Sequence, residues 1–458
     1  MKNNFFDIAI IGNGIIGSML AYQLVKNKYK KTCIVGPTER VGSASAAAGA
    51  MLNVFGEVDY DKSTDNYLEE KIKAGIKSQI LWKEFKKKIK NKNNIFCADN
   101  TIIFKSKNST FLEKKCYEAI AKYAKLYGVY SNNHSKLKQL KKNNKFKKIE
   151  TFLIKGEGAV NSKKLFNFID NEIIDKIKIF NTNAKYIRKR KNLFSIKLND
   201  NQTIKAKKII LCAGSFSKKI LKGSKLNILD LYYGVGSAFE LNDTKKILFN
   251  KIPNRTVLRS PNRGSTCGLH VVPRSENNYY LGAGSYISHE PNYSHRSGTL
   301  NYLLSSAEKE IFGNFTKVDC KPVIGFRPFS FDGKPMIGPI SKDVFVATGT
   351  KRDGLTLSPL IVDFIMNWLK NNNYADKNFV KWLPNRDPIS FGDQLFSTEV
   401  YINNKIAGLL EHNDINKQDL TRVKKELRSE SLKFHKKIIK LKKLKNNFGV
   451  HPEILNTF

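Results

Sequence analysis

The chain has 458 residues, enough for two or three domains with large hydrophobic cores. Its six cysteines lie far apart and form no Cys-x-x-Cys pair, which argues against a zinc site and a disulfide framework. This spacing is typical of a reducing, cytoplasmic setting, and no metal is expected. Asp7, Asn13 and several glycines interrupt the N-terminal apolar run too often for a secretory signal. No segment reaches the roughly 18 uninterrupted apolar residues of a membrane-spanning helix.

The formal net charge of +40 at pH 7 has two interpretations. It would attract nucleic acid, an anionic membrane or an acidic partner. Alternatively, it reflects the composition that an AT-rich genome favours. Lysine is then abundant together with asparagine and isoleucine, and the lysines lie on solvated surfaces. We favour compositional drift because the excess is lysine, whereas arginine is the preferred residue for bidentate phosphate recognition. A nucleic-acid partner is therefore not expected.

The N-terminus carries a dinucleotide-binding pattern. Residues 6–11 form a short apolar run, Gly12-x-Gly14-x-x-Gly17 follows, and residues 18–25 can continue as a helix. Gly12 allows a tight turn, Gly14 lets the backbone approach a pyrophosphate, and Gly17 lets the helix pack on the strand. The first N–H groups of the helix and its dipole would then face the phosphates.

The ribose half of this pattern is missing. The second strand, residues 32–35, should end in Asp or Glu to hold the ribose hydroxyls, but Gly36 stands there. Glu39 could substitute only if the loop were shifted. The small-residue run of residues 42–52 permits close approach to a flat ligand, with a tightly packed helix start as the alternative.

Hydrophobic spacing and turn signals predict the remaining elements. The predicted helices are residues 63–90, 111–127, 162–173 and 300–312, and a glycine-rich stretch at 348–359 opens another that runs to Leu369. The predicted strands are residues 101–105, 194–198, 203–206, 208–211, 270–273, 279–282 and 344–347. Residues 156–161 are predicted to be a loop.

Several short segments together carry a family resemblance. They are Gly12-x-Gly14-x-x-Gly17, Ser45-Ala-Ala-Ala-Gly49-Ala-Met-Leu52, Gly158-Ala-Val-Asn161, Ala213-Gly-Ser215, Val272-Pro-Arg274 with Gly282-Ala283, Gly325-x-Arg327-Pro328, Asp332-Gly-x-Pro335 and Arg352-x-Gly354. In order and spacing they resemble the D-amino-acid oxidase superfamily of FAD enzymes, most of all glycine oxidase and the bacterial D-amino-acid dehydrogenases. The resemblance spans residues 5–370, about four-fifths of the chain.

The resemblance implies an α/β fold with a discontinuous architecture. A Rossmann-like FAD-binding domain would take residues 1–60, 155–225 and 320–372. An α+β substrate domain on a mostly antiparallel sheet would take residues 61–154 and 226–319. A basic helical extension, residues 373–458, lies outside the resemblance; apolar spacing predicts an amphipathic helix over residues 414–446, interrupted by Ser431. Packing against the body is its expected role, with docking on anionic lipid or a partner as the alternative.

The resemblance further implies noncovalent FAD, because Cys320 lies outside the position that would carry a covalent flavin. The positions that match cofactor-binding motifs are Gly12, Gly14, Ile15, Gly17, Ser45, Ala48, Gly49, Met51, Val160, Ala213, Gly214, Arg327, Gly349, Arg352, Gly354, Leu355 and Thr356.

The family transfers hydride from the carbon next to an amine to flavin N5, and the protein positions the substrate. The resemblance assigns Arg327 and Arg352 to the substrate carboxylate, which the planar guanidinium suits; surface or structural ion pairing is the alternative. His270 replaces a tyrosine and could bond the substrate, titrate near neutral pH, or be structural. Tyr232, Tyr233 and Tyr286 are further candidates for lining the pocket.

The resulting prediction is an FAD-dependent oxidase or dehydrogenase acting on a D-amino acid, glycine or an N-substituted amino acid. The electron acceptor would be O₂ or a quinone, and the latter would bring peripheral contact with the inner membrane face. Two alternatives stay open. One is oxidation of an amine on modified tRNA, and the other is flavin binding without catalysis.

Overall fold

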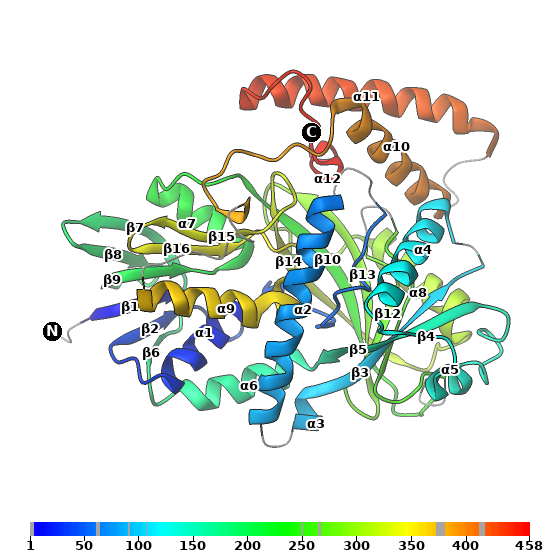
Figure 1. The fold of residues 1–458 in the computed structure, drawn as a ribbon, viewed down its shortest axis with the longest axis horizontal. Coiled ribbons are helices and arrows are strands. Elements are labelled where there is room, and N and C mark those ends of the chain that lie inside the picture. The colour runs from blue at the N-terminus through cyan, green and yellow to red at the C-terminus, as the bar shows by residue number, and fades with distance from the viewer. Residues whose placement is uncertain are drawn as a thin grey trace.

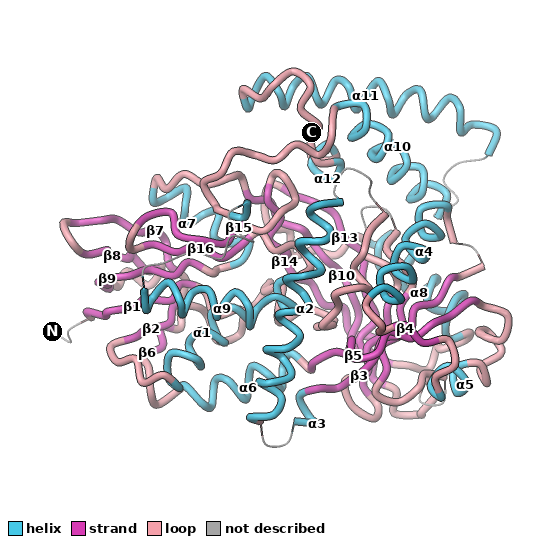
Figure 2. The backbone as a smooth tube through the Cα atoms, viewed as in Figure 1, coloured by secondary structure: helices cyan, strands magenta, loops and turns pink. Residues whose placement is uncertain are grey.

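The computed structural model describes residues 4–60, 65–89, 92–107, 109–248, 251–263, 267–371, 381–411 and 417–458. Within these ranges the strands form two eight-stranded sheets, on the left and the right of Figure 1, with helices packed around them. Figure 2 shows the two groups of strands in magenta. In the same ranges, no helix combines the length and the apolar character needed to cross a membrane.

The first sheet has β1 near its centre, in the order β15-β16-β9-β1-β2-β6, and the β7–β8 hairpin extends from β9. Strands β16, β9, β1, β2 and β6 run parallel. Alternate residues of β1 enter two different cores, so both faces of the strand are apolar. The bounds are β1 (Phe5–Ile11), β2 (Thr32–Val35), β6 (Lys178–Phe180), β7 (Ala184–Arg190), β8 (Leu193–Leu198), β9 (Thr203–Leu211), β15 (Met336–Ser341) and β16 (Val344–Thr348).

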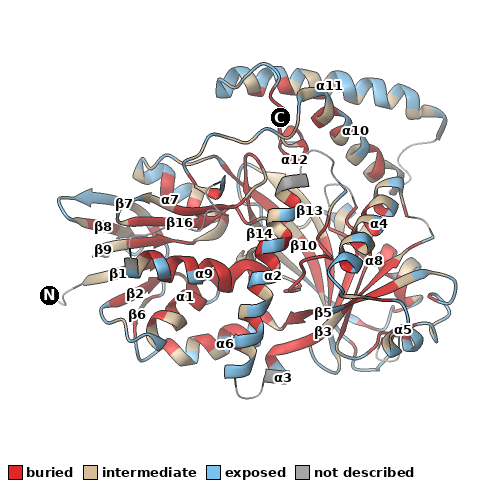
Figure 3. Cartoon of the chain, in the orientation of Figure 1, coloured by how far each residue is buried: buried red, intermediate tan, exposed pale blue. Residues whose placement is uncertain are grey.

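Helices cover both faces of this sheet. One core contains apolar residues of α1 (Ile15–Lys26), α2 (Asp65–Lys88), α6 (Ser162–Ile173) and α9 (Gly354–Asn371). The other core lies between the sheet and α7 (Ser217–Ser224). Figure 3 shows the strands of both sheets as mostly buried.

The second sheet has the order β14-β10-β13-β12-β11-β3-β5-β4 and is antiparallel except where β11 pairs with β3. Its strands are β3 (Phe96–Lys105), β4 (Tyr130–Ser131), β5 (Glu150–Val160), β10 (Leu231–Asn242), β11 (Thr256–Arg259), β12 (His270–Pro273), β13 (Asn278–Ser288) and β14 (Asp319–Ser330). The remaining helices before the extension are α3 (Lys92–Ile95), α4 (Phe111–Leu126), α5 (Ser135–Leu140) and α8 (Ser297–Ala307), which a π-helical turn (Glu308–Phe312) continues.

This architecture confirms the predicted fold class: a mostly parallel α/β sheet beside a mostly antiparallel one. By hydrogen bonding, β5 and β14 belong to the second sheet, although the predicted cofactor domain begins one of its segments at residue 155 and another at residue 320. Each of these two strands therefore spans a predicted boundary between the cofactor domain and the substrate domain. The division into domains stays a prediction.

Two local predictions were wrong. The predicted loop at residues 156–161 is mostly strand, since β5 runs on to Val160. Gly158 serves there as a point of close approach, because a Cβ on it would lie 1.9 Å from the carbonyl oxygen of Ala98. Residues 203–211 form one strand, not two, since the pairing with β1 continues through Ala206 and Lys208.

The C-terminal extension contains α10 (Gln394–Glu411), α11 (Leu420–Lys442) and α12 (Pro452–Leu455). The predicted helix at 414–446 is α11 with shorter ends, and part of its predicted start lies outside the described residues. Ser431, which interrupts the apolar stripe, meets Thr398 of α10 at 3.0 Å between the two hydroxyl oxygens. The expected packing is confirmed, because Ile438 and Leu455 join a buried cluster with Phe329 of β14.

Side chains of the extension also form ion pairs with residues in or beside two of the motifs that carried the family resemblance. Arg386 donates to both carboxylate oxygens of Asp332, at 2.8 and 2.9 Å, and the Asp332 side chain is fully buried. Glu453 of α12 pairs with Lys351 at 2.5 Å. Residues beyond the family motifs thus fix the loops on which those motifs lie.

Candidate cofactor and substrate site

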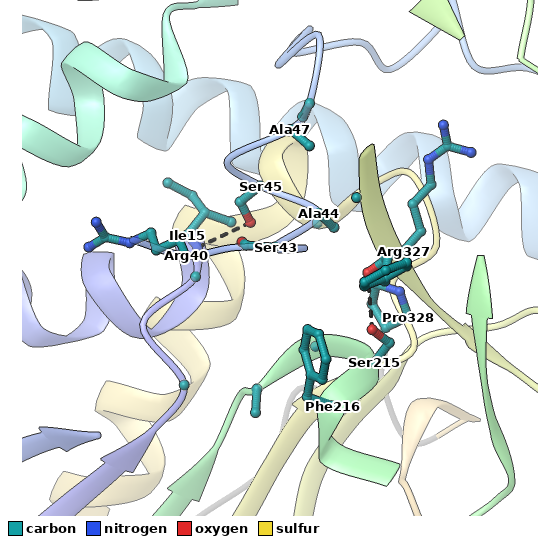
Figure 4. Close-up of a pocket in the computed structure, with 18 of the residues that line it drawn as sticks. Ile15, Arg40, Ser43, Ala44, Ser45, Ala47, Ser215, Phe216, Arg327 and Pro328 are labelled. Carbon is teal, nitrogen blue, oxygen red and sulfur yellow. Dashed lines mark hydrogen bonds between the residues drawn. The ribbon is translucent and has the colours of Figure 1, made fainter. Parts of the chain in front are cut away.

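A cavity of about 600 Å³ lies between the two sheets. Its walls come from the start of α1, the small-residue run of residues 43–51, the turn after β9, strand β14 and the start of α9. Figure 4 shows Arg40 on one side of this pocket and Arg327 on the other, with Ile15 and Ser45 between them. The cavity therefore has two chemically different ends.

At the Arg40 end, the N-terminus of α1 opens into the cavity. Gly14 is the N-cap, it has no side-chain cap, and the first turn carries no acidic residue. Ser45 accepts a hydrogen bond from the Ile15 N–H at 3.2 Å. The N–H groups of this first turn and the helix dipole make this a site suited to an anion such as a diphosphate.

Two glycines bring the backbone close together here. Gly12 has a φ of +109°, and a Cβ on it would lie 2.5 Å from the carbonyl oxygen of Cys212. A Cβ on Gly17 would lie 1.9 Å from the carbonyl oxygen of Gly12. Any larger residue at either position would force α1 away from the β1–β9 edge, so the glycines build the anion site by steric necessity.

At the Arg327 end, the second sheet contributes the wall. His270 of β12 and Tyr280 of β13 stack with ring centroids 5.8 Å apart, and the Tyr280 hydroxyl donates to the carbonyl oxygen of Ala47 at 3.0 Å. Burial raises the pKa of Tyr280 to about 12. Both rings are thereby fixed against the small-residue run.

His270 is a neutral ring in this position. Burial, helped by the charge of Arg259, lowers its pKa to about 3. Its Nδ1 lies 2.8 Å from the carbonyl oxygen of Gly268, and since a carbonyl only accepts, Nδ1 carries the proton. Nε2 is then an acceptor. The titration near neutral pH that the sequence allowed does not fit this environment.

A buried ionic network lies beside His270. Glu57 pairs with Arg259 at 2.7 Å and with Arg352 at 3.4 Å. Arg352 also lies 3.6 Å from Asp59. Burial alone would raise the pKa of Glu57, but the charges of Arg259, Arg352 and Lys71 outweigh it and hold the pKa below its ordinary value.

Because Lys71 pairs with Asp353 at 3.1 Å, this network contains three cations and three carboxylates and is close to neutral. The guanidinium of Arg352 is therefore already paired with two protein carboxylates, those of Glu57 and Asp59. Lys351, its neighbour on the cavity wall, is likewise paired with Glu453.

Arg327 differs from these cations. Among the described residues, no carboxylate pairs with its guanidinium. Its Nη2 lies so close to Gly236 of β10 that a Cβ there would be 2.7 Å away. Ser215 fixes the neighbouring backbone by donating to the carbonyl oxygen of Phe326 at 3.1 Å, as Figure 4 shows. Arg327 thus offers a bidentate donor to the cavity.

The family model for FAD-dependent oxidoreductases of the DAO family matches residues 7–366. The chain belongs to this family. A search of curated proteins finds no significant match to the sequence.

Solved structures of similar fold include two oxidases and a dehydrogenase. Glycine oxidase from Geobacillus kaustophilus is 19% identical with a TM-score of 0.68, covering 84% of this chain and 99% of its own. Iminodiacetate oxidase from Chelativorans sp. BNC1 is 17% identical with a TM-score of 0.65, covering 82% and 99%. L-proline dehydrogenase from P. horikoshii is 14% identical with a TM-score of 0.63, covering 83% and 97%. At these identities the likeness concerns the fold.

The DAO family is FAD-dependent, and the cavity fits that cofactor. The uncapped start of α1 suits the diphosphate, and a second helix N-terminus, that of α9 at Gly354, also reaches the cavity wall. The small residues between Ser43 and Ala48 leave room for a planar ring system.

The predicted site residues line this cavity, with three exceptions. Gly17 packs α1 on the loop before it, Val160 is fully buried in β5, and Gly349 makes a turn with a φ of +69°. Cys320 is also away from the cavity, as are Tyr232, Tyr233 and Tyr286. The roles of the predicted residues stay predictions.

Sequence reasoning missed other residues on the wall, chiefly Asn13, Glu57, Cys267 and Tyr280. Most lie outside the matched motifs or at their variable positions. Glu57 had one available signal, since it is a carboxylate at the end of an apolar, glycine-containing segment. Its partner Arg259 is 202 positions away, and no local pattern connects them.

Proposed function

We propose that this FAD-dependent oxidoreductase oxidises a small amine that carries one carboxylate, and that Arg327 binds that carboxylate. The observation that carries the proposal is the distribution of charge around the substrate end of the cavity. Arg352 and Lys351 are paired with protein carboxylates, whereas Arg327 has no such partner among the described residues. A guanidinium at a cavity wall is a strong bidentate site for one carboxylate.

This proposal alters the role given to Arg352. The sequence grouped Arg327 and Arg352 as two substrate ligands. In the proposed site Arg352 instead neutralises Glu57 and Asp59, which would otherwise place negative charge beside the substrate carboxylate. Arg352 is thus a positioning residue.

FAD supplies the hydride acceptor of the reaction. Arg327 orients the substrate by its carboxylate, which fixes the carbon that carries the amine. The neutral Nε2 of His270 offers an acceptor on the same wall, suited to an amine N–H. The buried rings of His270 and Tyr280 exclude water from this end.

The names of the similar structures support the substrate class. Glycine, iminodiacetate and L-proline, named for three of them, are amines with a carboxylate close to the nitrogen. The electron acceptor, O₂ or a quinone, and any contact with a membrane stay predictions.

The test is an anaerobic screen for flavin reduction with the purified, FAD-loaded protein. The substrates are glycine, D- and L-amino acids, N-methyl amino acids and 2-hydroxy acids. We expect an amino or N-alkyl amino acid to bleach the flavin, and reoxidation with O₂ or a soluble quinone then identifies the acceptor. Bleaching by a 2-hydroxy acid alone would refute amine oxidation, and no bleaching at all would favour flavin binding without catalysis.

A further inference from the structure

The absence of a ribose carboxylate at Gly36 has a structural cause. Gly36 follows β2 and is buried, and a Cβ on it would lie 2.4 Å from Oδ1 of Asn13 and 2.5 Å from its Cγ. The Asn13 side chain therefore fills the space into which a side chain at position 36 would project. An Asp or Glu at position 36 would require the Asn13 side chain to move.

Asn13 is held in one orientation. Its Nδ2 donates to the carbonyl oxygen of Pro37 at 2.9 Å. The backbone carbonyl oxygen of Asn13 accepts from Nε of Arg40 at 2.9 Å. Arg40 in turn pairs with both carboxylate oxygens of Asp170, at 2.7 and 2.9 Å. Because the amide nitrogen is engaged, the amide oxygen is the group that remains available.

No donor within the described part of the chain bonds Oδ1 of Asn13. Asn13 and Gly36 both line the cavity, beside the start of α1 where a diphosphate would bind. Glu39, the alternative carboxylate, is exposed and is not on the cavity wall. An amide oxygen has two lone pairs, so it can accept from a hydroxyl, and being neutral it does not repel the diphosphate.

We infer that Asn13 replaces the missing carboxylate and accepts a hydrogen bond from the adenosine ribose of FAD. The inference depends on the cofactor of the family and not on the proposed substrate. Its failure would leave both the family and the role of Arg327 unchanged.

The experiment measures the dissociation constants of FAD and of its analogues that lack the 2′- or the 3′-hydroxyl of the adenosine ribose. The apoprotein is titrated, and flavin fluorescence reports binding. We expect wild-type protein to bind at least one deoxy analogue about 3- to 10-fold more weakly than FAD, the effect of losing one hydrogen bond. In Asn13→Ala this difference should shrink to less than about 2-fold.

Asn181→Ala is the matched control. Asn181 accepts from the Thr38 N–H at 2.8 Å and so supports the same loop, but it does not line the cavity. This variant should keep the wild-type difference between FAD and the deoxy analogue. The inference is overturned if wild-type protein binds FAD and both analogues equally, a result that needs no variant to fold. It is also overturned if Asn13→Ala discriminates as strongly as wild type.

Discussion

The guanidinium of Arg352 lies 3.4 Å from the carboxylate of Glu57, and this contact distinguishes Arg352 from Arg327. Both arginines line one cavity, but one closes a buried ionic network and the other faces the cavity without a carboxylate partner among the described residues. The same residue type therefore has two environments on the wall of one site, and we propose a different role for each. Single substitutions can separate these roles.

Arg327→Met should impair substrate binding and leave the fold intact. Loss of the carboxylate anchor should raise KM about 10-fold or more, which corresponds to about 1.4 kcal/mol. Arg352→Met should instead lower the free energy of unfolding by about 3 kcal/mol, because Glu57 and Asp59 lose a buried partner. Steady-state kinetics and denaturant unfolding of both variants measure the two effects, and a reversed pattern would exchange the assigned roles.

Gly236→Ala should displace the guanidinium of Arg327 while leaving the arginine and its charge in place. The new Cβ would lie 2.7 Å from Nη2 and 3.0 Å from Cζ of Arg327, so the flexible guanidinium must move. We expect KM to rise several-fold with little change in melting temperature. Gly298→Ala is the control, since a Cβ there meets nothing within 4 Å. Unchanged KM in Gly236→Ala would show that the position of Arg327 does not matter for binding.

His270 should make stability fall in acid. Burial lowers its pKa to about 3, against about 6.5 in an unfolded chain. Between these values only the unfolded chain binds the proton, so stability is full above pH 6.5 and is lost as pH falls toward 3, by about 1.4 kcal/mol per pH unit in mid-window. His270→Gln cannot titrate, and unfolding free energies measured from about pH 4 to 6 should show a slope shallower by one proton. An identical slope would mean that His270 is protonated in the folded protein.

Arg386→Met tests whether the extension supports the site. Asp332 is fully buried and would lose both of its short contacts to Arg386, so we expect destabilisation by about 3 kcal/mol. Lys381→Met, which breaks an exposed pair with Glu70, should change stability by less than about 1 kcal/mol. Equal melting temperatures for the two variants would mean that the extension packs on the body without stabilising it.

The sequence was sufficient where the determining interactions are local. The helix predicted at residues 162–173 matches α6, which Asn161 caps by accepting from the Lys164 N–H. The helix predicted from Phe111 begins there because Thr110 and Glu113 form a capping box. The close approaches expected at Gly12 and Gly17 are present for the same reason, since the pattern of the first turn itself requires them.

The sequence was insufficient where a long-range contact decides. Arg352 lies in a recognisable motif, but its pairing with Glu57 joins residues almost 300 positions apart, and only the fold brings them together. The departure at Gly36 was visible, whereas its cause in the Asn13 side chain was not. Leu441 kept the apolar spacing of α11, yet its side chain is 63% exposed, although the neighbouring Lys442 pairs with Asp230 of the body.

The most direct test of the central claim compares an amino-acid substrate with its carboxamide. For whichever amino acid reduces the flavin, the dissociation constant is obtained from anaerobic flavin bleaching with the acid and with the amide, in wild type and in Arg327→Met. We predict that wild type binds the acid at least about 10-fold more tightly than the amide, and that Arg327→Met loses this preference. Equal binding of acid and amide by wild type, or a preference that survives in Arg327→Met, would contradict the assignment of Arg327 as the carboxylate anchor.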